Sequence, residues 1–305
     1  MLASRTHKTK ALFALGWVSI IWGTTWLASK EGVKTMPAIQ LAGIRQVIAG
    51  VLYLTFFIIR KETFPKGRQW RAILILAFLN FMLSNALSTW GVKYISSGLG
   101  SIMAAIFPLW LAIITMLKGG RIPRQAFIGL LLGFGGVCII FYEHLIDFLN
   151  PTFRFGILLS LSATISWAFG TLYMKQQAMH FNPYFSLGFQ MLISGIVLLT
   201  GIHVTGNDIS LSSITAYSWW SISYLVVFGS IFTFIAYIYS LQHLPTALAS
   251  VYAYINPIVA VILGAVLVGE KMTIFIAIGG LIIIIGVYLV NNSLKKKTLP
   301  EELVT

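Results

Sequence analysis

Charged residues are scarce in this chain of 305 residues: they make up 10% of the sequence, while hydrophobic residues make up 58%. A soluble domain carries about 25% charged residues. With a mean hydropathy of +0.87, the chain has too few polar side chains to cover a water-facing surface. The composition therefore excludes an ordinary soluble domain, and lipid must be the main solvent of this protein.

Other residue types and motifs are also missing. The single cysteine, Cys138, excludes an internal disulfide, and the five histidines fall in loops or at the ends of apolar runs. None of the eight acidic residues lies inside an apolar run, and GxSxG, HExxH and glycine-rich phosphate motifs are absent. These absences argue against an enzyme, a metal site or a cofactor. The net charge of +13 is spread over short loops, which does not favour nucleic acid binding.

Apolar runs of roughly 20 residues, the length that crosses a bilayer, recur along the whole chain. Charged or turn-rich residues separate them. The runs cover residues 11–29, 38–59, 72–92, 98–117, 126–142, 155–175, 183–201, 217–240, 247–268 and 273–291. We therefore expect an all-α integral membrane protein of ten transmembrane helices, in contact with the lipid bilayer.

The basic residues predict the orientation. With the N-terminus inside, fifteen Lys and Arg residues lie in inner segments and five lie in outer loops. Because basic residues in short loops resist translocation, both termini should be cytoplasmic. The basic, then apolar, N-terminus resembles a signal peptide. Since nine further runs follow, we interpret it as a retained first helix of a multi-pass protein of the inner (plasma) membrane.

The two halves of the chain match one another. An offset of 145 pairs Trp22 with Trp167 and Arg45 with Gln190. Offsets of 149 and 150 produce further pairs, namely Ser101 with Ser250, Pro108 with Pro257, Gly129 with Gly279 and Gly136 with Gly286. We expect repeats at residues 11–142 and 155–291, with cytoplasmic tails at 1–10 and 292–305. Five spans are an odd number, so the second repeat is inverted, an architecture typical of secondary transporters.

Two stretches carry a family resemblance: residues 93–114, KYISSGLGSIMAAIFPLWLAII, and residues 243–273, HLPTALASVYAYINPIVAVILGAVLVGEKMT. They resemble the EamA-type transporters of the drug/metabolite transporter superfamily. The resemblance implies alternating access around a central cavity walled by the third, fourth, eighth and ninth spans, with help from the first and sixth. The fifth and tenth spans should pack away from it. Because the repeat mate of Glu270 is Gly120, we expect Glu270 to cap a helix at the membrane surface.

Polar groups in hydrocarbon are costly, so they should face a cavity or a neighbouring helix. We expect the substrate to be bound by Trp22, Thr25, Arg45, Asn85, Ser88, Ser101, Trp167, Tyr237, Tyr254 and Asn256. Two alternatives stay open: serine and threonine hydroxyls often bond the backbone or neighbouring helices, and tryptophans often form an interfacial belt. The mid-span prolines, Pro108 and Pro257, suit hinges or simple packing. Gly129, Gly133 and the glycines of the last span suit close helix packing, with a homodimer as one outcome.

Arg45 is the single charge inside a predicted span. A charge at the bilayer centre costs about 2.5–3.5 kcal/mol on insertion scales. One interpretation is that its long side chain snorkels to the outer surface. The other is that it turns inward and attracts an anionic or carboxylate-bearing substrate.

The missing intramembrane carboxylates disfavour exchange of a cation for a proton. We therefore expect a small uncharged, zwitterionic or weakly anionic metabolite. Amino acids or related metabolites, moved outward, are the first choice by family resemblance. A neutral metabolite such as a nucleoside or sugar is the alternative, and a channel is the alternative from another class.

Overall fold

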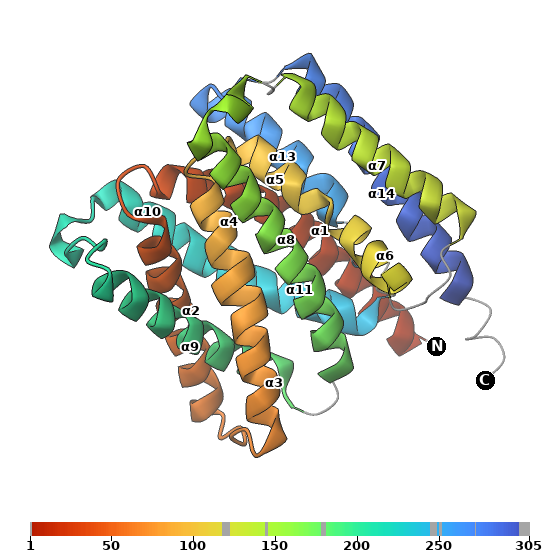
Figure 1. Ribbon diagram of the computed structural model, residues 1–305. Helices are drawn as coiled ribbons and strands as arrows, with labels where there is room; N and C mark the ends of the chain where they lie inside the picture. The colour runs from red at the N-terminus through yellow and green to blue at the C-terminus, as the bar shows by residue number, and fades with distance from the viewer. Residues whose placement is uncertain are drawn as a thin grey trace.

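The computed structural model describes residues 2–117, 123–143, 146–177, 181–244, 249, 252–271 and 273–298, and every regular element in them is helical (Figure 1). The first half of the chain forms α1 (Leu2–Gly32), α2 (Ala38–Ile59), α3 (Arg68–Leu76), η1 (Ala77–Asn85), α4 (Ala86–Gly91), α5 (Ser97–Ala105), α6 (Phe107–Leu117) and α7 (Arg124–Glu143). The second half forms η2 (Asp147–Leu149), α8 (Pro151–Gln177), α9 (Pro183–Val204), η3 (Leu211–Ser213), α10 (Ala216–Tyr224), η4 (Leu225–Phe232), α11 (Thr233–His243), α13 (Tyr252–Val268) and α14 (Ile274–Thr298).

Six helical stretches in the described residues have the length and apolar composition to cross a membrane. They are His7–Gly32, Ala38–Ile59, Arg68–Gly91, Pro151–Met174, Pro183–Val204 and Ala216–His243. Four shorter apolar helices overlap the remaining expected spans, namely Ser97–Leu111, Arg124–Ile140, Ile255–Val268 and Ile274–Leu289. The expected all-α architecture is confirmed with six clear spans, and full crossing by the other four stays a prediction.

Within the described residues, three of the expected spans depart from a uniform α-helix. The third and the eighth each contain a π-helical segment, η1 and η4, in the middle of a continuous rod. The fourth is broken at Ile106, which separates α5 from α6. Pro108 explains the break, because it has no backbone N–H and its ring crowds the carbonyl group of Ala104, four residues earlier. π-Helical turns are rare and frequently mark functional sites.

The start of α5 is fixed by two polar side chains. The hydroxyl of Ser96 accepts a hydrogen bond from the backbone N–H of Leu99 at 3.1 Å. The carboxylate of Glu270, in the segment between α13 and α14, accepts from the backbone N–H groups of Ser97 at 2.8 Å and Gly98 at 3.2 Å. These bonds satisfy amides that the helix leaves open, and a negative charge is favourable at a helix N-terminus. The capping role expected for Glu270 is confirmed.

Glycines bring two pairs of helices into close contact. A Cβ on Gly136 of α7 would lie 2.6 Å from the carbonyl oxygen of Gly279 in α14, and one on Gly286 would lie 2.5 Å from that of Gly129. In the second pair, Gly50 of α2 packs in the same way on the backbone of α9. These glycines therefore serve packing within one chain, as expected. A homodimer through such faces stays a prediction.

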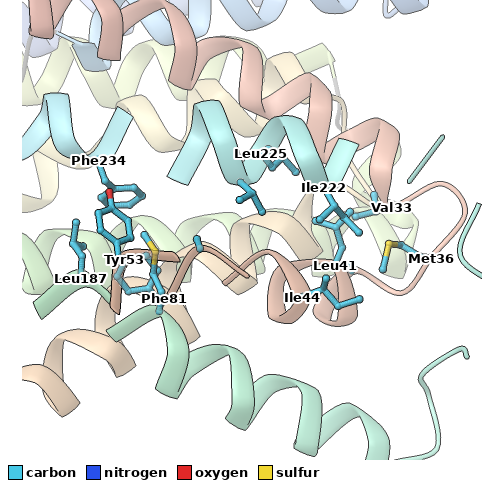
Figure 2. Close-up of a cluster of buried hydrophobic side chains, with 14 of the residues drawn as sticks. Val33, Met36, Leu41, Ile44, Tyr53, Phe81, Leu187, Ile222, Leu225 and Phe234 are labelled. Carbon is cyan, nitrogen blue, oxygen red and sulfur yellow. The ribbon is translucent and has the colours of Figure 1, made fainter. Parts of the chain in front are cut away.

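The helix bundle has two ends. At one end, α1 begins beside the end of α11, where the ring of His7 stacks on that of His243 at 5.4 Å. We call this end the N-terminal face. At the other end, the distal face, α1 ends near the start of α5, and Lys30 Nζ donates to the carbonyl oxygen of Ile95 at 2.8 Å. A cluster of buried hydrophobic side chains, including Leu41 and Leu225, packs between α2 and the α10–η4 rod (Figure 2).

Candidate functional site

A cavity of about 140 Å³ lies inside the bundle. It extends from Trp22, in the middle of α1, to Ser29, near the end of α1 at the distal face. Its walls are Trp22, Thr25, Trp26, Ser29, Arg45, Asn80, Ser84, Asn85, Ser88, Thr89, Ala104, Phe107, Ala163, Thr164, Trp167, Phe234, Tyr252 and Asn256. Among the described residues, none from α7 or α14 lines the cavity, and no acidic side chain does.

Arg45 projects from α2 into this cavity and is 5% exposed. Its Nε donates to the Ser230 hydroxyl oxygen of η4 at 2.8 Å. A Cβ on Gly229 would lie 3.1 Å from its Nη2, so glycine leaves room for the guanidinium. No ion pair to Arg45 occurs within the described part of the chain. The side chain has turned inward, so the snorkelling alternative is wrong. A buried guanidinium without a carboxylate partner suits an anionic group of a ligand.

Amide and hydroxyl side chains of η1 and α4 form the cavity wall from Asn80 to Thr89. Gln46 of α2 orients one of them, because its Nε2 donates to Asn85 Oδ1 at 3.2 Å. In a π-helix the backbone bond runs from residue i to i+5, which places Asn80 and Asn85 on one face. The π-helical segment therefore presents two amides to the cavity, where an α-helix would present one.

A cluster of aromatic rings lies at the end of the cavity nearer the N-terminal face. We call it the aromatic cluster, and it consists of Trp22, Trp167, Phe234, Tyr237 and Tyr252. The Trp22 ring centroid lies between 4.9 and 6.0 Å from the other four. Trp22 Nε1 donates to the Gly229 carbonyl at 3.2 Å, and Trp167 Nε1 donates to the Tyr252 hydroxyl at 3.1 Å. Both indole groups are therefore satisfied well inside the bundle, which excludes an interfacial belt for this pair.

Seven of the ten candidate residues line the cavity: Trp22, Thr25, Arg45, Asn85, Ser88, Trp167 and Asn256. Two of these residues, Thr25 and Ser88, also bond the backbone of their own helix, which was the alternative for serine and threonine hydroxyls. The Thr25 hydroxyl donates to the carbonyl of Trp22 at 2.7 Å, and that of Ser88 donates to the carbonyl of Asn85 at 3.0 Å. Each hydroxyl oxygen keeps its capacity to accept a hydrogen bond, and both residues line the cavity.

The other three candidates lie elsewhere. Ser101 is 1% exposed, and its hydroxyl donates to the carbonyl of Gly98 in its own helix at 2.6 Å, so it is absent from the cavity wall. Tyr237 is 2% exposed and lies behind the wall, in the aromatic cluster. Tyr254 belongs to α13, and its side chain lies outside the described residues.

The two hinge candidates differ. The helix is interrupted just before Pro108, whereas α13 continues through Pro257. With its amide nitrogen turned toward them, Asn256 donates to the carbonyls of Ser19 at 2.6 Å and Tyr252 at 3.2 Å. Neither acceptor is the carbonyl of Ala253, the one that Pro257 leaves without its α-helical donor. The hinge role of both prolines stays a prediction.

Several wall residues were not among the candidates, notably Trp26, Ser29, Asn80 and Tyr252. Helical spacing could have found the first two, because Trp26 lies four residues after Trp22 and Ser29 lies three after Trp26. Asn80 could have been found in the same way, because it lies four residues before Ser84 and eight before the candidate Ser88. Only its place beside Asn85 depends on the π-helix. Among the described residues, no group of three His, Cys, Asp or Glu side chains could hold a metal ion.

Known proteins resemble this chain over most of its length. The EamA-like transporter family matches residues 9–142 and 154–292. The uncharacterized inner membrane transporter YedA of Escherichia coli strain K12 is 31% identical, over 86% of this chain and 83% of its own. The uncharacterized transporter YvbV of Bacillus subtilis is 27% identical, over 94% of this chain and 93% of its own. A crystal structure with 15% identity superposes with a TM-score of 0.66, covering 93% of this chain and 97% of that one, and shows the fold alone.

Proposed function

Because the chain belongs to the EamA-like transporter family and is a multi-pass membrane transporter, we propose that it carries a small carboxylate-bearing metabolite by alternating access. Amino acids and related metabolites, moved out of the cell, are the proposed substrates. The observation that carries this proposal is Arg45, a buried guanidinium that lines the central cavity and has no acidic partner among the described residues.

Two inverted five-helix repeats, 11–142 and 155–291, are part of the proposal, and helix contacts support them. In the α2–α9 pair, Gly43 packs against Leu199 and Gly188 against Leu54. The offset of 145 converts the first contact into the second, since it maps Gly43 onto Gly188 and Leu54 onto Leu199. Such an exchange is expected where two related halves face each other across a two-fold axis in the membrane plane.

A second pair of contacts near the cavity has the same property. Gly229 of η4 packs on Thr25 of α1, and Gly170 of α8 packs on Asn80 of η1. The repeat offsets map Thr25 onto Gly170 and Asn80 onto Gly229, so glycine and polar residue change places between the halves. The π-helical segments also occupy equivalent positions in the third helix of each half. These correspondences support ten crossings arranged as two inverted halves.

Alternating access requires a cavity that communicates with one side at a time. The cavity extends toward the distal face, and the aromatic cluster separates it from the N-terminal face. The repeat explains why polar residues lie on the distal side and aromatic rings on the other, because the repeat mates of Asn85 and Ser88 are Phe234 and Tyr237. The polar positions of one half are thus aromatic in the other. We propose that the aromatic cluster is the barrier that must open during transport.

The size and chemistry of the cavity support a small solute. The cavity volume of about 140 Å³ is the space open to the centre of a water-sized sphere, and one water molecule occupies about 10–15 Å³ on that measure. The cavity therefore has room for about ten non-hydrogen atoms. Arg45 offers charged N–H donors to a carboxylate, and the amides of Asn80 and Asn85 offer donors and acceptors to neutral groups. With no acidic side chain in the described wall, a purely cationic substrate is disfavoured.

The basic residues give the orientation of the proposal. Fifteen of them belong to the expected inner segments; of these, the N-terminal tail and the connection 60–71 lie at the N-terminal face, which makes that face cytoplasmic in this proposal. The cavity then adjoins the outer side of a cell's inner membrane.

The proposal is tested with purified protein in proteoliposomes. Vesicles loaded with an unlabelled amino acid are mixed with the same amino acid in labelled form, across a panel in which each amino acid is paired with its amide. A carboxylate carrier should show saturable uptake that the internal amino acid accelerates. Uptake that rises linearly and does not depend on the internal solute would indicate a channel. When nucleosides and sugars are added to the panel, transport confined to them would select the neutral alternative. Medium from overexpressing and deletion strains, compared by metabolite profiling, tests export.

A further inference from the structure

A second cavity, of about 440 Å³, lies between α3, α8, α9 and α11, on the side of the N-terminal face. Most of its wall is buried and apolar, including Ile73, Leu76 and Ile238. Its polar wall residues include Ser186 and Gln190 in α9 and the exposed Arg68 at the start of α3. None of these residues lines the central cavity.

The repeat shows why space remains here. The mates of Ile73, Leu76 and Ser186 at the distal face are Ile222, Leu225 and Leu41. Figure 2 shows these three side chains gathered in the hydrophobic cluster, where all are fully buried. The leucine at position 41 therefore fills the distal position that the smaller Ser186 leaves open near the N-terminal face.

By their repeat positions, Gln190 and other wall residues correspond to residues of the central cavity. Gln190 is the repeat mate of Arg45, and two further wall residues, Met174 and Ile238, are mates of the central-cavity residues Ser29 and Thr89. Gln190 is 3% exposed, and its Nε2 donates to the Ser186 hydroxyl oxygen at 2.8 Å. Its Oε1 has no hydrogen-bond partner in the described part of the chain. A buried acceptor without a donor is costly, and a ligand N–H or O–H would satisfy it.

We infer that this second cavity is a binding site for the transported solute on the N-terminal side of the aromatic cluster. The solute is of one class: a small carboxylate that also carries an N–H or O–H donor. Gln190 accepts from that donor, and Arg68 attracts the carboxylate to the mouth of the cavity. This inference rests on the proposed function, because it assigns the site to the same solute.

The test is transport measured separately from each face in vesicles of known protein orientation, with the amino acid that gives the fastest counterflow. Ser186→Leu copies the distal half and fills the cavity. It should raise KM at least about tenfold from the N-terminal face and leave KM from the distal face within about threefold. Ser186→Thr keeps a hydroxyl for Gln190 Nε2 and adds only one methyl group, so it should raise KM from the N-terminal face by less than Ser186→Leu does. If KM from the N-terminal face is unchanged in Ser186→Leu, the second site is overturned. The proposed carrier function still holds in that case, provided that the wild-type protein transports the amino acid.

Thiol labelling provides a second measurement that does not require the leucine variant to fold. In a Cys138→Ala background, Ser186→Cys should react with a small thiol reagent added from the N-terminal face. The same amino acid, added from that face, should slow this reaction at least about threefold, because it occupies the space beside position 186. Equal reaction rates with and without the amino acid would reject the site, whereas absence of wild-type counterflow would reject the proposed function instead.

Discussion

Replacing Arg45 by Gln tests the centre of the proposed mechanism. The change copies the repeat mate Gln190 and removes the charge while keeping an amide. In the structure the guanidinium is 5% exposed, with Nε bonded to the Ser230 hydroxyl at 2.8 Å. A hydrogen bond to a charged group contributes about 1.5–3 kcal/mol, and 1.4 kcal/mol is a factor of ten in affinity. KM for the carboxylate substrate should therefore rise about 10- to 150-fold.

The amide analogue of the substrate, assayed above the pKa of its amino group so that the whole molecule is uncharged, is the matched control for Arg45→Gln. The carboxamide of the analogue carries no negative charge to pair with Arg45, and the glutamine side chain can still donate a hydrogen bond to it. KM for the amide should therefore change by less than about threefold in Arg45→Gln. Arg45→Lys keeps the charge and loses both the planar fork and the Nε bond to Ser230, so it should fall between wild type and Arg45→Gln. The assay is initial uptake into proteoliposomes at a series of concentrations.

The stability of the Arg45→Gln variant should not interfere with the KM measurement. The insertion cost of a buried charge, about 2.5–3.5 kcal/mol, disappears in Arg45→Gln, and the lost bond to Ser230 offsets part of that gain. The variant should therefore reach the membrane in normal amounts. If KM for the carboxylate and for its amide change by the same factor, Arg45 does not bind the carboxylate, and the substrate assignment fails.

Three further predictions concern the barrier, the orientation and the packing. Replacing Trp22 or Trp167 with Ala should lower the transport rate in proteoliposomes without loss of protein from the membrane, and full activity in both variants would exclude a role for the aromatic cluster. Asn207→Cys in a Cys138→Ala background should react with an impermeant thiol reagent from outside the cell, and reaction from the cytoplasm would reverse the orientation. Gly286→Ala should destabilise the α7–α14 pair by about 1–3 kcal/mol, because its Cβ would lie 2.5 Å from the Gly129 carbonyl oxygen. Thermal unfolding in detergent measures that loss, while KM for the substrate should stay unchanged.

Sequence patterns predicted much of the helical architecture, because apolar length and charged breaks are local properties. The boundaries of α2, residues 38–59, were predicted to the residue. The break at Ile106 follows from Pro108, yet Pro257 sits inside a continuous helix. Proline removes a donor in both cases, and the surrounding packing determines whether the helix then breaks. The π-helical segments could not be predicted, because no residue type in Ala77–Asn85 requires an extra residue per turn.

The candidate site also contains residues that the sequence predicts and residues that it does not. Seven residues could be placed at the cavity from polarity, depth and repeat position, since a polar group inside hydrocarbon has few other places to face. Ser101 satisfied the same criteria, but its hydroxyl bonds the carbonyl one turn earlier in its own helix. Asn80 was missed although its spacing to Ser84 and Ser88 fits one helix face, and only its position beside Asn85 depends on the π-helix.

The sequence by itself determined that lipid is the main solvent of this protein, that its two halves share one pattern, and that Arg45 lies well inside an apolar run. Composition and the positions of residues along the chain are enough for these conclusions, because none of them depends on which helices contact one another. The inward turn of Arg45 toward Ser230, the aromatic cluster around Trp22 and the space beside Ser186 were decided by the tertiary structure. Each of these features depends on which side chains of a helix distant in the sequence face the residue. The spacing of residues along one helix does not determine which helix packs against it.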